Sequence, residues 1–246
     1  MTGYSAKRIS SLHTGRNHFW FRHRNRVIAG KLYKALAGIS HPRILELGCG
    51  SGIIANYLKA LGYEMTASDL NPGFQSFLTD GIDAFEYSLG DDPPPERAQA
   101  YDALLLGDVI EHIRNPVAAL QKARGFIRPG GILLVTVPAM RELWSELDDF
   151  SLHVKRYGPG DLRREMQAAG YAVESLEYFM FIPAVILYIQ RGMILGKGSR
   201  RLNHDSLAIP GYVNAILEMC MRMEYHVLKQ IAAPFGSSLI TIGRKS

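Results

Sequence analysis

Short apolar segments that alternate with helix-like segments from residue 42 onward constrain the fold of this chain more than any other feature. Such apolar segments are typical of strands in a parallel sheet with both faces covered. We predict strands at residues 43–47, 65–68, 84–87, 102–106, 132–137, 171–180 and 239–244, and helices at 53–61, 74–79, 115–126 and 159–169. Right-handed crossovers then give an α/β fold with a doubly wound, mostly parallel, seven-stranded Rossmann-like sheet whose last strand is antiparallel.

The length of 246 residues, 47% of them hydrophobic, suits a single domain spanning 1–246. Within it we expect an N-terminal helical lid (1–40) and a helical cap (182–236) inserted between the sixth and seventh strands. The aromatic run at residues 19–21 fits either a helix packed on the sheet or a lid that closes over a ligand, with Arg22 or Arg24 reaching in. The methionine-rich cap fits core packing, a dimer contact, an acceptor pocket or a membrane-facing patch.

Composition narrows the function classes. The two cysteines, Cys49 and Cys220, form no C-x-x-C pair, so we expect no disulfide framework and no metal site, and a cytoplasmic location. The longest apolar run, Phe179–Ile189, is shorter than the roughly 20 residues needed to cross a bilayer, but it is compatible with a peripheral membrane contact. The formal net charge of +5 is too modest to favour a nucleic acid partner.

The glycine-rich turn at residues 46–52 (ELGCGSG) joins the first predicted strand to the first helix. Glycines let a backbone approach a ligand closely, and the following helix directs its free N–H groups at the same place. Asp69 ends the second strand, where a carboxylate accepts both hydroxyls of a ribose. Ile53 replaces the third glycine of the dinucleotide pattern, and Glu46 would repel a pyrophosphate but accept a cationic sulfonium ligand with an ammonium group.

Three motifs in the expected order resemble those of class I S-adenosylmethionine-dependent methyltransferases. They are the turn at 46–52, residues 106–112 (LGDVIEH), which resemble the fourth-strand D-V-L-E-H motif, and residues 128–131 (RPGG) before the fifth strand. The aromatic-basic run at 18–22 and residues 144–157 and 234–236 are similar to a bacterial subgroup of the small-molecule type, which does not itself supply a substrate. The resemblance implies S-adenosylmethionine as cofactor.

The resemblance also assigns residues to the cofactor. The glycine turn would line its methionine portion, with Glu46 ordering the turn or facing the amino end, and Asp69 would hold the ribose with Leu70 beside the adenine. The backbone of Gly107 and Asp108 would meet the amino acid end, and Asp91 is the candidate for adenine contact. The remaining members of the expected cofactor set are Gly48, Cys49, Gly50 and Gly52.

The loop after the fifth strand carries the first candidate for a general base, His153, because this loop lies over the carboxyl ends of the strands. Its other explanation is a loop held by its own Asp–His and Asp–Arg pairs. His112 either contacts the acceptor or cofactor, or is a capping or core histidine. Arg156 and Tyr157 would grip an anionic acceptor, Tyr157 with a catalytic role. Trp20, Arg22 and Trp144 complete the expected acceptor pocket.

Four functions remain after this reasoning. We favour methyl transfer to an oxygen of a small, partly hydrophobic metabolite, because one histidine base suffices for that reaction. Methylation of RNA or protein is the second. A cofactor-binding protein that transfers no methyl group, as a scaffold or a rearrangement catalyst, is the third. A nicotinamide-dependent oxidoreductase is the most remote. A homodimer is compatible with the methionine-rich cap.

Overall fold

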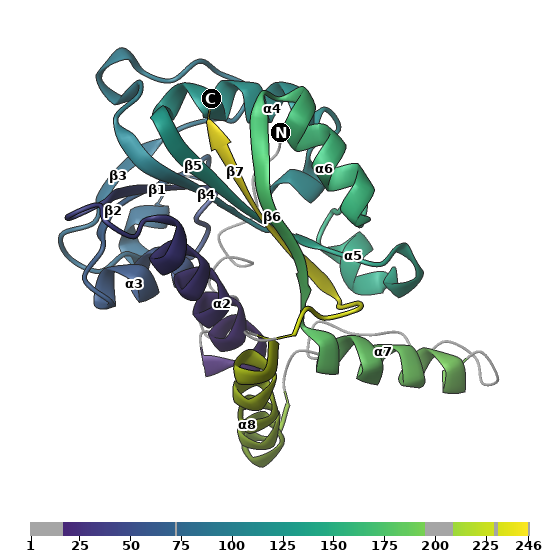
Figure 1. Cartoon of the computed structure of the whole chain (residues 1–246). Coiled ribbons are helices and arrows are strands. Elements are labelled where there is room, and N and C mark those ends of the chain that lie inside the picture. The colour runs from purple at the N-terminus through teal and green to yellow at the C-terminus, as the bar shows by residue number, and fades with distance from the viewer. Residues whose placement is uncertain (1–16, 72, 195–208, 229–230, 246) are drawn as a thin grey trace.

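In the computed structural model, a seven-stranded sheet lies between two layers of helices (Figure 1). The structure describes residues 17–71, 73–194, 209–228 and 231–245. The strand order is β3-β2-β1-β4-β5-β7-β6, and all neighbours pair in parallel except β7, which is antiparallel to both β5 and β6. The doubly wound, mostly parallel sheet with an antiparallel last strand is therefore confirmed.

The strands agree with the prediction to within a few residues, with one exception. They are β1 (Arg43–Leu47), β2 (Glu64–Asp69), β3 (Asp83–Glu86), β4 (Tyr101–Gly107), β5 (Ile127–Pro138), β6 (Tyr171–Phe179) and β7 (Ser238–Lys245). β5 begins five residues before its predicted start at 132, because Ile127 pairs with Tyr101 ahead of a register shift that absorbs the R-P-G-G turn. A glycine pair marks a bulge in this strand rather than its boundary.

The two faces of the sheet are covered by different helices, and this covering explains why the central strands are apolar on both sides. One face packs against α2 (Phe19–Ala35) and α3 (Ile53–Ala60), with Ile28 and Leu58 fully buried. The other packs against α4 (Pro116–Ala123) and α6 (Pro159–Ala168), with Leu120 and Leu162 fully buried. Together these contacts form two hydrophobic cores separated by the sheet.

Short helical segments fill the connections. They are η2 (Phe74–Phe77), η3 (Pro95–Arg97), η4 (Ile110–His112), η5 (Arg124–Phe126), η6 (Arg141–Leu143) and α5 (Glu146–Phe150). The predicted helix at 115–126 divides into α4 and η5. Asn115 caps α4, since its Oδ1 accepts a hydrogen bond from the Ala118 N–H at 3.3 Å.

Two helices lie between β6 and β7: α7 (Phe181–Ile194) and α8 (Gly211–Leu228). They leave and re-enter the sheet at the edge where β1, β4 and β5 end, and Figure 1 shows both extending beyond that edge. α8 packs along α2, and α2 also packs on the sheet through Ile28 and Leu32. For residues 19–35, this burial favours the packed helix over the lid. Residues 1–16 of the predicted lid and 195–208 of the predicted cap lie outside the described residues.

Candidate active site

The glycine turn is fixed to the end of β2 by its backbone. The N–H groups of Gly48 and Cys49 both donate to the Ser68 carbonyl oxygen, at 2.8 and 3.0 Å. Gly48 has φ +75°, and a Cβ there would lie 2.7 Å from Val109 Cγ2. Glycine is therefore required at position 48 for both its backbone angle and its space. Position 48 leaves no room for a side chain between β1 and the segment that follows β4.

Asp69, the last residue of β2, braces the same turn. One carboxylate oxygen accepts a hydrogen bond from the Gly50 N–H at 2.8 Å, and the other accepts from the Asn71 N–H at 2.9 Å. The side chain is largely buried, whereas that of the next residue, Leu70, is 40% exposed. A hydrogen-bonded carboxylate beside an exposed apolar side chain is the arrangement that a ribose and its adenine need.

Glu46 is buried beneath the turn, and the described part of the chain places no cationic group within hydrogen-bond distance of it. It is 1% exposed, and its Oε2 has no hydrogen-bond partner among the described residues. Burial raises the pKa of Glu46 to about 8, against the opposing effect of the Arg24 charge. Gly107 lies beside it, since a Cβ at Gly107 would be 4.0 Å from Glu46 Oε1 and 2.4 Å from Ile54 Cδ1. A buried acid with one unpaired oxygen, next to a side-chain-free position, fits the ammonium group of a cationic cofactor.

Asp108 follows β4 with a strained backbone, at φ +56°. Its Oδ1 accepts a hydrogen bond from Thr136 Oγ1 at 2.9 Å, and its Oδ2 pairs with Arg24 of α2. Arg22 does not occupy the acceptor pocket predicted for it. Its Nε lies 3.8 Å from Glu218 Oε1 of α8, and the guanidinium points away from the site. Arg24, not Arg22, is thus the α2 cation at the carboxyl ends of the strands.

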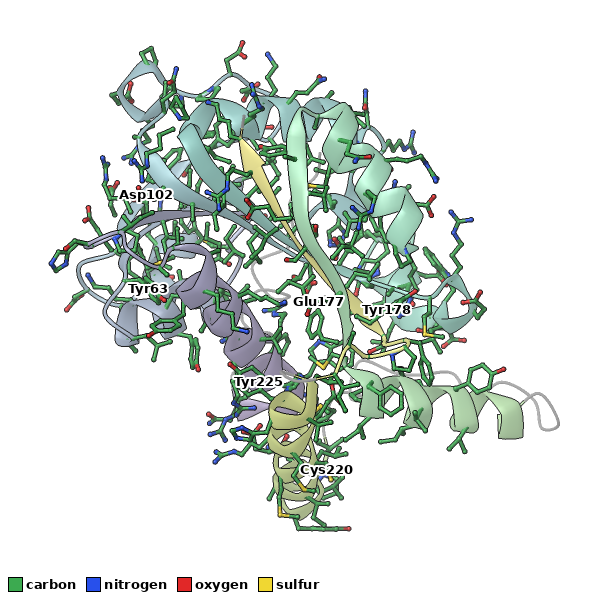
Figure 2. All side chains as sticks on the ribbon, in the orientation of Figure 1. Tyr63, Asp102, Glu177, Tyr178, Cys220 and Tyr225 are labelled. Atoms are coloured by element: carbon green, nitrogen blue, oxygen red, sulfur yellow. The ribbon has the colours of Figure 1, made fainter. Side chains whose placement is uncertain are left out.

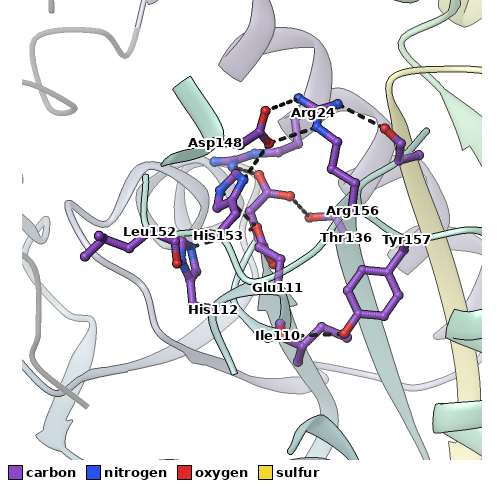
Figure 3. A network of polar contacts seen from close by, with 12 residues as sticks. Arg24, Ile110, Glu111, His112, Thr136, Asp148, Leu152, His153, Arg156 and Tyr157 are labelled. Carbon is purple, nitrogen blue, oxygen red and sulfur yellow. Dashed lines mark hydrogen bonds and ion pairs between the residues drawn. The ribbon is translucent and has the colours of Figure 1, made fainter. Parts of the chain in front are cut away.

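Asp148 of α5 is the hub of a polar network over β4 and β5 (Figure 3). Its buried carboxylate accepts from His153 Nδ1 at 2.8 Å and from Arg156 Nε at 2.8 Å. Arg156 also donates to the Ala139 carbonyl oxygen at 3.0 Å, which fastens the loop to the end of β5. Burial acts to raise the pKa of Asp148, but the hydrogen bonds from His153 and Arg156 hold it well below its ordinary value.

Glu111 is the residue that sequence reasoning missed. It is fully buried, and neither carboxylate oxygen has a hydrogen-bond partner among the described residues. Its Oε1 lies 4.0 Å from the Nε2 atoms of both His112 and His153, whose ring centroids are 4.8 Å apart. Burial raises the pKa of Glu111 well above its ordinary value. The three side chains offer ligand atoms within 4.8 Å of one another and are the group at this site that could hold a metal ion.

Tyr157 does not take the catalytic position expected from the sequence. It is fully buried, and its hydroxyl lies 3.4 Å from the Ile110 carbonyl oxygen, so it packs in the core beneath the network. Burial raises its pKa far above the range of a physiological base. Its contacts assign it to the support of the loop, because a catalytic group must reach the acceptor.

The other predicted residues occupy varied positions. His112 Nδ1 lies 3.3 Å from the Leu152 carbonyl oxygen, beside His153. Trp144 is 38% exposed and donates from Nε1 to Asp149 at 3.0 Å. Trp20 packs against the core on the α2 face of the sheet. Asp91 is exposed beyond β3, with its N–H on the Ser88 carbonyl oxygen.

Comparison with known proteins identifies the family of this chain. Residues 20–176 match the family described as the methyltransferase domain. A ubiquinone biosynthesis O-methyltransferase of Parvibaculum lavamentivorans is 29% identical over 123 residues, which cover 47% of this chain and 48% of that protein. Its counterpart in Azorhizobium caulinodans is 25% identical over 173 residues, 61% of this chain and 66% of that protein. The chain thus spans about half to two thirds of these relatives.

A solved structure adds evidence on the fold. Haemonchus contortus phosphoethanolamine N-methyltransferase 2, in complex with S-adenosyl-L-methionine, superposes with a TM-score of 0.59 at 14% identity. The match covers 95% of this chain and 57% of that one. The strand order, the glycine turn and the family match across 20–176 lead to one conclusion: this chain belongs to the methyltransferase domain family and is a class I S-adenosylmethionine-dependent methyltransferase.

Proposed function

We propose that this protein transfers the methyl group of S-adenosylmethionine to a hydroxyl oxygen of a small, partly hydrophobic molecule in the cytoplasm. The observation that carries the proposal is the orientation of His153. Its Nδ1 is held by Asp148, and its Nε2, which makes no hydrogen bond to Glu111, lies 4.0 Å from Glu111 Oε1. The relatives named O-methyltransferases support oxygen as the acceptor atom.

The cofactor half of the site would be formed by the turn and the two acids beside it. The backbone of Gly48, Cys49, Gly50 and Gly52 would contact the methionine portion. Asp69 would keep its N–H partners and accept from the ribose hydroxyls with its remaining lone pairs. Glu46 would face the ammonium group, and Gly107 and Asp108 the amino acid end. Leu70 and Asp91 are proposed for the adenine. When bound, S-adenosylmethionine supplies an electrophilic methyl group.

The acceptor half would handle the proton of the hydroxyl group. Because Asp148 accepts from Nδ1, the neutral ring of His153 carries its lone pair on Nε2, where it can take the hydroxyl proton. Asp148 then stabilises the resulting imidazolium, while Arg156 keeps the carboxylate in place.

The test is methyl transfer to a panel of catechols and phenols, with S-adenosylhomocysteine and methylated product both measured. His153→Gln should lower turnover by roughly 10²- to 10⁴-fold and leave the Kd for S-adenosylhomocysteine within about twofold. His41→Gln, at an exposed histidine before β1, is the matched control and should retain full turnover. Undiminished turnover of His153→Gln would refute the base assignment.

Two further readouts separate the alternatives. Loss of wild-type turnover in EDTA, with recovery on adding a divalent cation, would make Glu111, His112 and His153 metal ligands and overturn the role of His153 as a base. Methylation of added RNA or protein in preference to small phenols would overturn the acceptor class. Tight binding of S-adenosylmethionine without any S-adenosylhomocysteine formed across the acceptor panel would favour a protein that binds the cofactor without transfer.

A further inference from the structure

The outward face of α8 carries a continuous apolar stripe. Its members follow one another at intervals of three or four residues, which places them on a single side of the helix. They are between 54% and 71% exposed, whereas Met221 on the opposite side is fully buried. We call this set the α8 outer stripe; it consists of Tyr212, Ile216, Met219, Met223 and Val227.

Both carboxylates of α8 point inward, away from the stripe. Glu218 accepts hydrogen bonds from Arg26 at 2.6 Å and Arg222 at 3.1 Å. Glu224 accepts from the N–H groups of Phe181 and Ile182, at 3.0 and 2.8 Å, and so holds the start of α7. No negative charge of α8 therefore accompanies the stripe at the surface.

A basic hollow borders the stripe. Arg22, Arg26 and Arg222 converge on the single carboxylate of Glu218, which leaves an excess of two positive charges. The side chains of Arg22 and Arg222 are 45% and 58% exposed, and Arg26 Nη1 has no hydrogen-bond partner among the described residues. These arginines line part of a hollow of about 720 Å³ between α2, α3 and α8, which also reaches Ser51 of the glycine turn. Its donors are suited to anionic oxygens.

α7 extends the apolar surface at the same edge of the sheet. Its Ile186 and Ile189 are 37% and 49% exposed, and the start of α7 is fastened to α8 by Glu224. Figure 2 shows the side chains of α8, among them Cys220, projecting below the body of the sheet. Both helices follow residue 176, where the match to the methyltransferase family ends. They lie outside the part of the chain that matches the family, at the edge of the sheet where the site lies.

We propose that the α8 outer stripe and the basic hollow beside it bind the surface of a bilayer that contains anionic lipids. An exposed apolar helix face flanked by arginines is the pattern of a helix that lies in the membrane interface. In the described ranges no helix is both long and apolar enough to span a bilayer, so the contact is peripheral. A second copy of this chain fits less well, because a twofold contact through the stripe would bring the two arginine clusters together.

Co-sedimentation with two kinds of vesicle tests the contact. One kind contains phosphatidylcholine alone, and the other contains phosphatidylcholine with roughly 30% phosphatidylglycerol, an anionic lipid. Wild-type protein should bind the anionic vesicles at least tenfold more tightly, and binding should weaken with added salt. Met219→Glu/Met223→Glu should lose at least tenfold in vesicle affinity. Arg22→Gln/Arg222→Gln should lose the preference for anionic vesicles.

The matched control is Tyr33→Glu/Leu61→Glu, which places the same two charges at exposed apolar residues off the stripe and should bind like wild type. Circular dichroism and S-adenosylhomocysteine binding verify that each variant is folded. Equal binding to both vesicle types, or unchanged binding by Met219→Glu/Met223→Glu, would overturn the proposal. So would a wild-type dimer that this variant converts to a monomer without any vesicle binding, since the stripe would then be a contact between copies.

Discussion

The two halves of the site hold their geometry by different means. Over β1 and β2, backbone N–H groups of the glycine turn do so, bonded to the Ser68 carbonyl oxygen and to the nearby carboxylate of Asp69. Over β4 and β5, ionisable side chains centred on Asp148 do so. The difference teaches that the proposed cofactor half depends on local backbone shape, while the acceptor half depends on charges brought together from distant parts of the chain.

The largest effect is expected where the acceptor half depends on charge. Asp148→Asn should lower the free energy of unfolding by about 3 kcal/mol, because it leaves the nearly buried Arg156 without its carboxylate. Urea denaturation at pH 7 measures this loss. Asp149→Asn, one residue away and exposed, is the control and should cost less than about 1 kcal/mol.

The pH dependence of the unfolding free energies of wild type and Asp148→Asn provides a sharper test. The folded pKa of Asp148 is depressed, so its contribution is fully present above the unfolded pKa of roughly 3.9 and is lost as the pH falls toward the folded value. The gap between wild type and Asp148→Asn should therefore narrow below about pH 4. A gap that stays constant from pH 7 to pH 3 would contradict the charge-based account of this half.

The same contrast explains what the sequence could predict. The turn at 46–52 and Asp69 are local signals, since glycine spacing and a strand end determine where they lie. The burial of Glu111 was not predictable, because it depends on residues 148–156 folding back across β4 and β5. Tyr157 was misjudged for the same reason: the backbone of this loop bonds to Pro138 and carries the ring into the core.

Arg24 is different, because a signal for it was present. It lies four residues before Ile28 and eight before Leu32, the two fully buried apolar residues of α2. Residues at this spacing share a helix face, so the periodicity places Arg24 on the inward side. Arg22 lies on another face and reaches α8 instead. The helical periodicity of α2 alone would therefore have predicted that Arg24, and not Arg22, faces the site.

The next largest effect concerns the cofactor half. Asp69→Ala should weaken S-adenosylhomocysteine binding by about 100-fold, as expected for the loss of two hydrogen bonds to a carboxylate. Isothermal titration calorimetry measures the Kd. Asp80→Ala, at an exposed aspartate outside the turn, should leave the Kd unchanged. An Asp69→Ala variant that binds within twofold of wild type would remove the ribose assignment.

A smaller effect separates two reasons for glycine in the turn, the positive φ angle and the lack of space for a Cβ atom. Gly48→Ala should cost about 2 kcal/mol more stability than Gly50→Ala, because both positions have positive φ but only Gly48 has Val109 Cγ2 at 2.7 Å from a new Cβ. Urea denaturation of Gly48→Ala, Val109→Ala and the double variant gives the coupling between the two sites. Costs that simply add would show that the close contact has no role.

The smallest effect is the pH dependence of cofactor binding through Glu46. With a pKa of about 8, this carboxyl is mostly protonated in the free protein at pH 6. Its raised pKa means that it favours the folded state below its unfolded pKa and loses that contribution as the pH rises toward 8. A neighbouring ammonium group favours the ionised form, so binding should release a proton and tighten by up to about tenfold per pH unit between roughly pH 6 and pH 7.5. Calorimetry of S-adenosylhomocysteine binding across this range measures the slope. Glu46→Gln cannot ionise and should give a flat profile, whereas an equal slope in both proteins would place the titrating group elsewhere.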